Sequence, residues 1–283
     1  MRRLVVVPPL VLAALFAPAR PLAAAPPLTL VACAPGYPGT RAEAQPSMDA
    51  FAAAVAGAAG WPERDVAAVY EETEQGGLAR LGRSDAAVAL VPLPFLAEHG
   101  AALKLSPRLQ VDEKENGLFQ SWSLVAKRGR VGAPAALAGY TILSTAGYAP
   151  RFVRSSLANW GRLPDTARIA FTTQVLSALR KAASGADVAV LLDGYQTAAL
   201  ATLPFANDLE VVSRSAPVPV AFVCTVGARI STSRWRILER ALEALPGSPA
   251  GAAALEGIRM VRFVAPDAAA LATARRLAGG APR

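Results

Sequence analysis

A regular alternation of strand-like and helix-like segments begins at Leu28, and it limits the possible folds of this chain more than any other feature. Leu28–Ala34, Asp65–Tyr70 and Asp85–Val91 are short apolar runs typical of buried strands, and helix-like segments lie between them. Successive units of strand and helix predict a parallel sheet joined by right-handed crossovers. We therefore expect an α/β fold.

The helices expected in this first part follow polar or proline-containing loops. Ser47 is the predicted N-cap of the first helix, whose Met48, Phe51 and Val55 fall at helical spacing. The polar stretch Glu71–Gly77 is predicted to be a loop before a short second helix, and its glutamates are expected to face solvent.

The alternation is interrupted twice, which predicts two crossings between domains. Phe119–Val125 alternates apolar and polar residues after a charged turn, and the proline-rich link Ala216–Pro219 comes later. Between them the strand and helix rhythm resumes, for example at the predicted strand Arg168–Phe171. We predict a two-lobed fold with a cleft, in which residues 26–117 and 215–283 form lobe 1 and residues 118–214 form lobe 2.

The first 25 residues differ from the rest of the chain. Two arginines precede an apolar run from Leu4 to Phe16, and small residues continue to Ala25. This order is typical of a secretory signal peptide, because the apolar run is too short to span a membrane. We predict cleavage near Ala25 and a periplasmic protein. Lipidation at Cys33 is an alternative, although processing there would remove the first predicted strand.

The charge and the cysteines bear on partners and on redox state. The net charge of +8 falls to +5 without the three arginines of the first 25 residues, and the remaining arginines are spread along the chain. No nucleic acid partner is expected, because a binding stripe needs clustered charge.

Cys33 and Cys224 are the only cysteines, and either one disulfide or two buried thiols fits their apolar surroundings.

Catalytic patterns are scarce. His99 is the only histidine, so multi-histidine metal sites are ruled out, and no Gly-x-Ser-x-Gly turn accompanies it. We find neither a phosphate-binding loop with a lysine nor a dinucleotide fingerprint. We expect no enzyme activity, no metal and no cofactor, and an exported hydrolase using Glu71, Glu72 and His99 is the weaker alternative.

The segment Gly139–Trp160 is predicted to be a strand, a small-residue turn and a helix that begins at Pro150. A helix start offers unpaired backbone N–H groups, and the hydroxyls of Ser144 and Thr145 add donors, so an oxyanion fits this turn. Arg151 and Arg154 would add positive charge, which on the alternative interpretation merely faces solvent.

Ligands of parallel α/β sheets bind beside the loops that follow the strands. The predicted binding residues come from such loops in both lobes, and most of them bear hydroxyl groups: Tyr37, Thr40, Pro94, Ser144, Thr145, Gly147, Tyr148, Thr173, Asp193 and Tyr195.

The order of four motifs resembles the type 2 periplasmic solute-binding proteins, and in particular the phosphate, phosphite and phosphonate-binding subunits of ABC transporters. The motifs are LTLVACAPGYPGT, SDAAVALVPLPF, AGYTILSTAGYAPRFV and ADVAVLLDGYQ. In that family a Ser/Thr-Ser-Gly turn holds the oxyanion, and Ser144–Gly147 matches it in part. Thr172, Thr173 and Gln174 stand where the family usually has a loop with a histidine.

The resemblance implies two lobes that close by hinge motion around a small anionic ligand and deliver it to a membrane ABC permease. We expect a monomer. The alternative is a binding-protein fold that serves as a sensor or an accessory module of a membrane complex, without a transport role.

Overall fold

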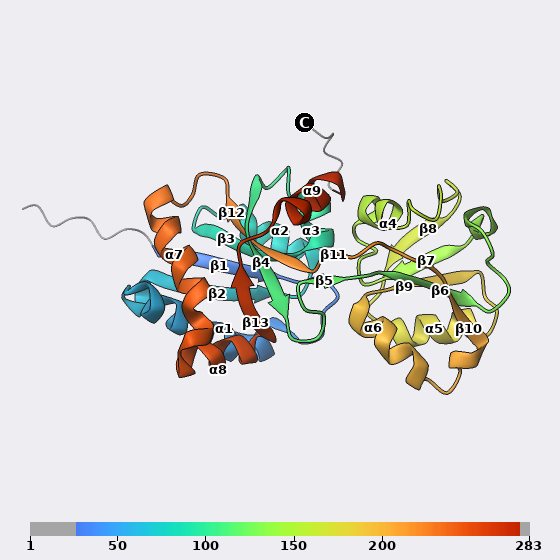
Figure 1. The fold of residues 1–283 in the computed structure, drawn as a ribbon, viewed down its shortest axis with the longest axis horizontal. Coiled ribbons are helices and arrows are strands. Elements are labelled where there is room, and N and C mark those ends of the chain that lie inside the picture. The colour runs from blue at the N-terminus through green and yellow to red at the C-terminus, as the bar shows by residue number, and fades with distance from the viewer. Residues whose placement is uncertain (1–26, 278–283) are drawn as a thin grey trace, which may run out of the picture.

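The computed structural model describes residues 27–277, and two α/β lobes lie side by side in it (Figure 1). The predicted signal peptide, with its cleavage site near Ala25, lies outside the described residues. The prediction of a two-lobed α/β fold is confirmed. The large sheet takes its strands from residues 28–113 and 221–264, and the small sheet from residues 123–214. Lobe boundaries at residues 117 and 215 stay a prediction.

The large lobe is built on a six-stranded sheet of order β13-β4-β12-β3-β1-β2. β1 is parallel to β2 and β3, as the first units predicted, whereas β12 is antiparallel to β3 and β4, and β13 is antiparallel to β4. The sheet is therefore mixed. Its strands are β1 Leu28–Cys33, β2 Val66–Glu71, β3 Ala86–Pro92, β4 Leu105–Glu113, β12 Ala221–Val226 and β13 Met260–Val264.

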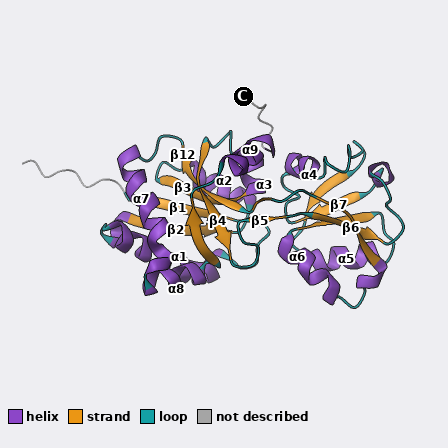
Figure 2. Ribbon diagram, in the orientation of Figure 1, coloured by secondary structure: helices purple, strands orange, loops and turns teal. Residues whose placement is uncertain are grey.

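Helices cover both faces of this sheet (Figure 2). Successive residues of β1 face opposite layers, since Leu30 packs with Phe51 of α1 while Val31 belongs to the core on the other side. Between residues 27 and 277, no helix has both the length and the apolar character that crossing a membrane requires. The helices of this lobe are α1 Arg41–Ala59, α2 Glu74–Gly82, α3 Leu93–His99, α7 Thr232–Ala244, α8 Pro249–Gly257 and α9 Ala268–Leu277, with short 3-10 turns at Glu63–Asp65 and Leu245–Gly247.

The first helix begins earlier than predicted. α1 starts at Arg41, so Ser47 lies inside the helix and the prediction that Ser47 is the N-cap was wrong. Thr40 is the N-cap, and its side chain accepts the N–H of Glu43 while Glu43 accepts the N–H of Thr40. This reciprocal pair stabilises the first turn, and the helix therefore continues through Pro46 despite the missing N–H.

The polar stretch Glu71–Gly77 is mostly not a loop. α2 begins at Glu74, because the hydroxyl of Thr73 caps it by accepting the N–H of Gly76 at 3.0 Å. Glu71 ends β2 and is 3% exposed, and the guanidinium of Arg41 binds its carboxylate. The expectation that these glutamates all face solvent was therefore wrong for Glu71.

The small lobe has a five-stranded sheet of order β10-β6-β9-β7-β8. β7 is parallel to β8 and β9, and β6 is antiparallel to β9 and β10. The strands are β6 Ser123–Lys127, β7 Thr141–Ser144, β8 Arg168–Phe171, β9 Val188–Leu192 and β10 Leu209–Arg214. The helices are α4 Pro150–Ser156, α5 Val175–Ala183 and α6 Gly194–Ala199, with 3-10 turns at Pro134–Leu137, Leu200–Thr202 and Ala206–Asp208.

Two short strands join the lobes. β5 (Phe119–Gln120) pairs with β11 (Val218–Pro219) in an antiparallel two-stranded sheet between the lobes (Figure 1). The predicted strand Phe119–Val125 is thus divided into β5 in this hinge and β6 in the small lobe. The two predicted crossings lie side by side, as a hinge requires.

A second contact joins the lobes beside the hinge. α3 of the large lobe and α4 of the small lobe pack together, and the C-terminal helix α9 contacts both of them. Phe152 of α4 and Ala270 of α9 are fully or almost fully buried in one hydrophobic core that reaches into both lobes. Arg151 of α4 donates to Glu98 of α3, with 3.2 Å between Nη2 and Oε1. We call this contact of α3, α4 and α9 the helical seam.

The two cysteines are free and buried. Cys33 ends β1 and Cys224 lies in β12, and β3 runs between these two strands. Two strand spacings of about 4.8 Å exceed the roughly 7 Å over which a disulfide can form. Of the two interpretations left open by the sequence, the structure shows two buried thiols.

Candidate functional site

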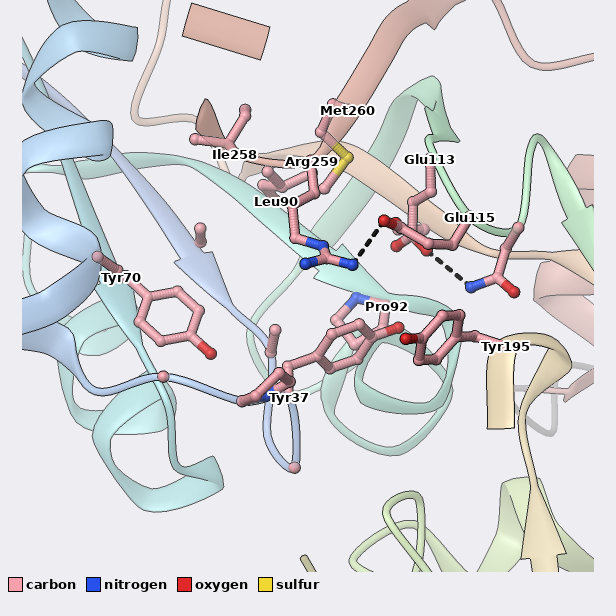
Figure 3. Close-up of a pocket in the computed structure, with 18 of the residues that line it drawn as sticks. Tyr37, Tyr70, Leu90, Pro92, Glu113, Glu115, Tyr195, Ile258, Arg259 and Met260 are labelled. Carbon is pink, nitrogen blue, oxygen red and sulfur yellow. Dashed lines mark hydrogen bonds and ion pairs between the residues drawn. The ribbon is translucent and has the colours of Figure 1, made fainter. Parts of the chain in front are cut away.

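A pocket of about 450 Å³ opens between the lobes. Most of its wall comes from the large lobe, and Thr145, Asp193, Tyr195 and Gln196 line it from the small lobe. The volume is that of a site for a small organic molecule. Figure 3 shows the large-lobe residues of the wall, with Tyr195 facing them from the small lobe.

The loop after β1 brings the lobes into contact at the pocket. Gly36 has a φ of +87°, and a Cβ at this position would lie 2.9 Å from the Cβ of Thr145. Only glycine adopts this conformation readily and also leaves room for the small lobe. The next residue, Tyr37, lines the pocket. The glycine of the motif APGYPGT therefore sets how closely the two lobes approach.

Three tyrosines form the flat walls of the pocket. Tyr37 follows β1, Tyr70 lies in β2, and Tyr195 lies in α6 of the small lobe. The hydroxyls of Tyr37 and Tyr195 point toward one another in Figure 3. The hydroxyl of Tyr70 is buried and has no hydrogen-bond partner among the described residues. Burial raises the pKa of Tyr37 well above its ordinary value, and the charges of Glu113 and Asp193 raise it further.

Two buried carboxylates line the pocket, one from each lobe. Glu113 ends β4 and is 7% exposed, and the amide of Asn116 donates to its Oε2 at 3.0 Å. Burial raises the pKa of Glu113 to about 7; the hydrogen bond of Asn116 lowers it, and the charge of Asp193 raises it. The sequence places Glu113 at the end of a central strand, where the strand meets the hinge.

Asp193, from the small lobe, is 8% exposed and caps α6. Its Oδ1 accepts the N–H of Gln196 at 2.7 Å, and the side chain of Gln196 accepts the N–H of Asp193 in return. Burial raises the pKa of Asp193 in spite of the hydrogen bonds that lower it.

The pocket wall is acidic. Four carboxylates line it, from Glu43, Glu113, Glu115 and Asp193, and among the described lining residues Arg259 is the one cationic side chain. Arg259 donates from Nη2 to Oε1 of Glu115, so its charge is already paired within the wall. The electrostatic field in the pocket therefore favours cations over anions.

The structure brings four of the ten predicted residues together in the pocket, namely Tyr37, Thr145, Asp193 and Tyr195. The other six do not line it. Pro94 is buried in the first turn of α3, Thr40 caps α1, and Thr173 is exposed before α5. Tyr148 packs edge-on against Phe171, with 6.0 Å between the ring centroids.

The last two of these residues, Ser144 and Gly147, lie in the turn predicted to hold an oxyanion. The predicted strand, turn and helix all form, and α4 begins at Pro150. Ser144 is buried, its hydroxyl donates to the carbonyl of Leu191 at 2.8 Å, and it accepts the N–H of Ala146. The N–H of Gly147 donates to the carbonyl of Ser144, and a Cβ on Gly147 would lie 2.1 Å from a backbone oxygen of β8.

The two arginines near this turn are engaged elsewhere. Arg151 binds Glu98 in the helical seam, and Arg154 donates to the carbonyls of Pro164 and Ala167 within the small lobe. Neither lines the pocket. Thr145 is therefore the part of the predicted anion site that reaches the pocket.

His99 has a structural environment. Its Nε2 lies 2.7 Å from Oε1 of Glu74, and its ring packs against Phe95 at a centroid distance of 4.9 Å. His99 ends α3, as its position in the sequence predicted, and it does not line the pocket.

Sequence reasoning missed Tyr70, Glu113, Glu115, Asn116 and Arg259. Three of these lie in the segment VDEKENG, whose charges indicated a solvated turn at the domain junction. The available signal was position, because Tyr70 and Glu113 lie at or next to the ends of strands that point toward the hinge.

No family model matches the chain, and no curated protein matches it either. Solved structures do match. A protein of Xanthomonas citri, XAC2383, solved with chloride, is 15% identical with a TM-score of 0.69, and the match covers 89% of this chain and 96% of that one. A binding protein component of an ABC phosphonate transporter from Pseudomonas aeruginosa is 13% identical with a TM-score of 0.62, over 89% and 86% of the chains.

A third match is PhnD1 of Prochlorococcus marinus in complex with methylphosphonate, at 11% identity and a TM-score of 0.55, over 88% of this chain and 97% of that one. These likenesses show the fold, which is that of the type 2 periplasmic solute-binding proteins. Within that class, the similar structures include phosphonate-binding proteins, the branch that the sequence motifs resemble.

Proposed function

We propose that this protein is an extracytoplasmic solute-binding protein, which captures a small molecule between its lobes and delivers it to a membrane ABC permease. The observation that carries this proposal is the pocket of about 450 Å³, whose wall is shared by two lobes across a two-stranded hinge. Two lobes joined in this way close around a ligand by rotation about the hinge.

Binding without catalysis is the function that the other observations support. The similar structures with TM-scores of 0.5 or more include a binding protein component of an ABC phosphonate transporter, PhnD1 with methylphosphonate, and a TctC solute binding protein. His99, on which an exported hydrolase would depend, is bound to Glu74 outside the pocket. The secretory signal predicted for residues 1–25 supports an extracytoplasmic location.

A phosphate-like or phosphonate-like oxyanion is the ligand that the sequence predicted. The hydroxyl-bearing Thr145 at the pocket wall supports it, and one similar protein was solved with methylphosphonate. The acidic wall and the internal hydrogen bonds of Ser144 and Gly147 favour a ligand of the other sign.

Thermal unfolding of the mature chain tests the binding function. The chain is heated with a library of metabolites that spans anions, neutral compounds and cations, and binding to the native state raises the midpoint temperature by mass action. Small-angle scattering should then show that the same compounds make the chain more compact. If no compound in any charge class stabilises the chain, the solute-binding role is wrong; recovery of that chain in a membrane complex would favour the accessory-module alternative.

A further inference from the structure

We infer that the pocket takes an organic ligand with a protonated amine, and that the carboxylates of Glu113 and Asp193 bind its nitrogen. This inference rests on the proposed function and names the ligand class of the same pocket. It differs in charge from the ligand that the sequence motifs imply.

The two carboxylates reach the pocket from different lobes and are more than nine-tenths buried, at 7% and 8% exposure. The amide of Asn116 donates to Oε2 of Glu113, while Oε1 accepts no hydrogen bond from the described residues. Asp193 is held by the backbone at the start of α6. Both acceptors are therefore fixed in position before a ligand arrives.

Neither carboxylate has a cationic side chain as a hydrogen-bonded partner among the described residues. Arg259 is the cationic side chain among the described residues of the pocket wall, and it donates a hydrogen bond to Glu115. Burying a carboxylate without a counter-charge is costly, and an anionic ligand would add repulsion. Burial and the charges of Asp193 and Glu115 raise the pKa of Glu113 and outweigh the charge of Arg259, which lowers it. An ammonium group supplies further counter-charge and, because the two carboxylates belong to different lobes, also favours the closed arrangement.

The rest of the wall defines the body of the ligand. Its apolar part is formed by Met48, Leu90, Pro92, Ala221, Ile258 and Met260, and its flat part by Tyr37, Tyr70 and Tyr195. These surfaces suit an aryl or alkyl chain rather than ammonium itself or a polyamine. Tyrosine faces also attract cations. The unpartnered hydroxyl of Tyr70, which points toward Tyr37 in Figure 3, offers one more polar contact.

The pH dependence follows from the groups that face Glu113. Asn116 and Arg259 lower the pKa of Glu113, whereas burial, Asp193 and Glu115 raise it. The charge of Glu113 in turn raises the pKa of Tyr37. Glu113 has a pKa of about 7, whereas an alkylamine keeps its proton to about pH 10. Only ionised Glu113 attracts the amine, so affinity rises as the pH increases through 7.

The test uses three probe sets that share a skeleton and differ in charge: 2-phenylethylamine, 3-phenylpropionate and 2-phenylethanol; tryptamine, indole-3-propionate and tryptophol; and hexylamine, heptanoate and hexanol. Calorimetry is carried out with the mature chain at about pH 6 and about pH 8, on either side of the pKa of Glu113. The variants are Glu113→Gln and Asp193→Asn, which keep the local hydrogen bonds. Glu243→Gln, exposed on α7 and outside the pocket, is the matched control.

We expect amines from these sets to bind more tightly than the acids and alcohols, and more tightly at the higher pH. Glu113→Gln and Asp193→Asn should each weaken amine binding by about tenfold or more, the effect of one charged hydrogen bond, and Glu243→Gln should not. In Glu113→Gln the increase with pH should be lost.

Three outcomes would overturn the inference. Preferential binding of the acids or alcohols, or amine binding that is unchanged in both pocket variants, refutes the amine ligand and leaves the solute-binding role intact. Failure of all nine probes also refutes this ligand class, and the thermal screen of anions, neutral compounds and cations then decides separately whether the solute-binding role stands.

Discussion

Replacing Glu113 by glutamine is expected to stabilise the free protein at neutral and alkaline pH. Burial raises the pKa of Glu113 from its usual 4.5 to about 7, and each unit of that difference corresponds to about 1.4 kcal/mol. Above pH 7 the ionised carboxylate therefore lowers the free energy of unfolding by about 3 kcal/mol.

The sign follows from proton binding. Between pH 4.5 and about 7 the folded chain holds a proton on Glu113 that the unfolded chain has lost, so this group's contribution to stability is fully present below 4.5 and decreases as the pH rises through 7. Glutamine stays neutral throughout. The difference in free energy of unfolding between Glu113→Gln and the natural chain should be near zero at low pH. It should increase to about 3 kcal/mol in favour of the variant above pH 7.

Urea unfolding at a series of pH values measures this difference. Tryptophan fluorescence is a suitable signal, because Trp235 is buried in the same lobe as Glu113. Glu243→Gln, which removes an exposed charge from the same lobe, should show no comparable pH-dependent gain. A Glu113→Gln variant whose advantage does not change with pH, or one that is less stable than the natural chain at about pH 8, would refute the argument from burial.

Three further outcomes are expected. Gly77→Ala should lower the free energy of unfolding by about 1 to 3 kcal/mol, because its Cβ would lie 2.0 Å from Sγ of Cys33, and the loss measured by urea unfolding should be smaller in a Cys33→Ala background; equal losses in both backgrounds would contradict this contact. Thr40→Ala should cost about 1 kcal/mol by loss of the α1 cap, whereas Thr40→Ser should cost less, and equal urea midpoints would count against the capping box. Without any reductant, a thiol reagent should modify both Cys33 and Cys224 after unfolding and neither quickly in the native protein, and a denatured chain that stays unreactive would reveal a disulfide.

The sequence predicted the parts of the fold that local patterns determine. β8 coincides with the predicted strand Arg168–Phe171, and α4 begins at Pro150 as expected. The start of α1 was predicted at the cap residue Ser47, whereas the reciprocal pair formed by Thr40 and Glu43 begins the helix at Arg41. Thr40 and Ser47 are both residue types that cap helices, and the sequence alone does not show which of them begins the helix.

The site was less predictable because its chemistry depends on contacts between distant segments. Ser144 has the residue type of an anion-binding turn, yet its hydroxyl is bound by the carbonyl of Leu191 in the neighbouring strand β9. Glu113 lies in a charged run that is typical of a solvated surface, and it is buried with Asp193 of the other lobe close enough to raise its pKa. Burial of this kind is set by how the lobes meet, which no local pattern records.

The helical seam restricts how the pocket can open. Because α9 packs on both α3 and α4, separating the lobes there would expose buried apolar surface. We therefore expect the pocket to open by rotation about β5 and β11. We expect the helical seam and the hinge to lie near the rotation axis and to move little as the lobes separate. Paired spin labels near Ala270 and Phe152 should therefore keep a constant separation, whereas labels near Ile258 and Tyr195 should move apart when the pocket empties.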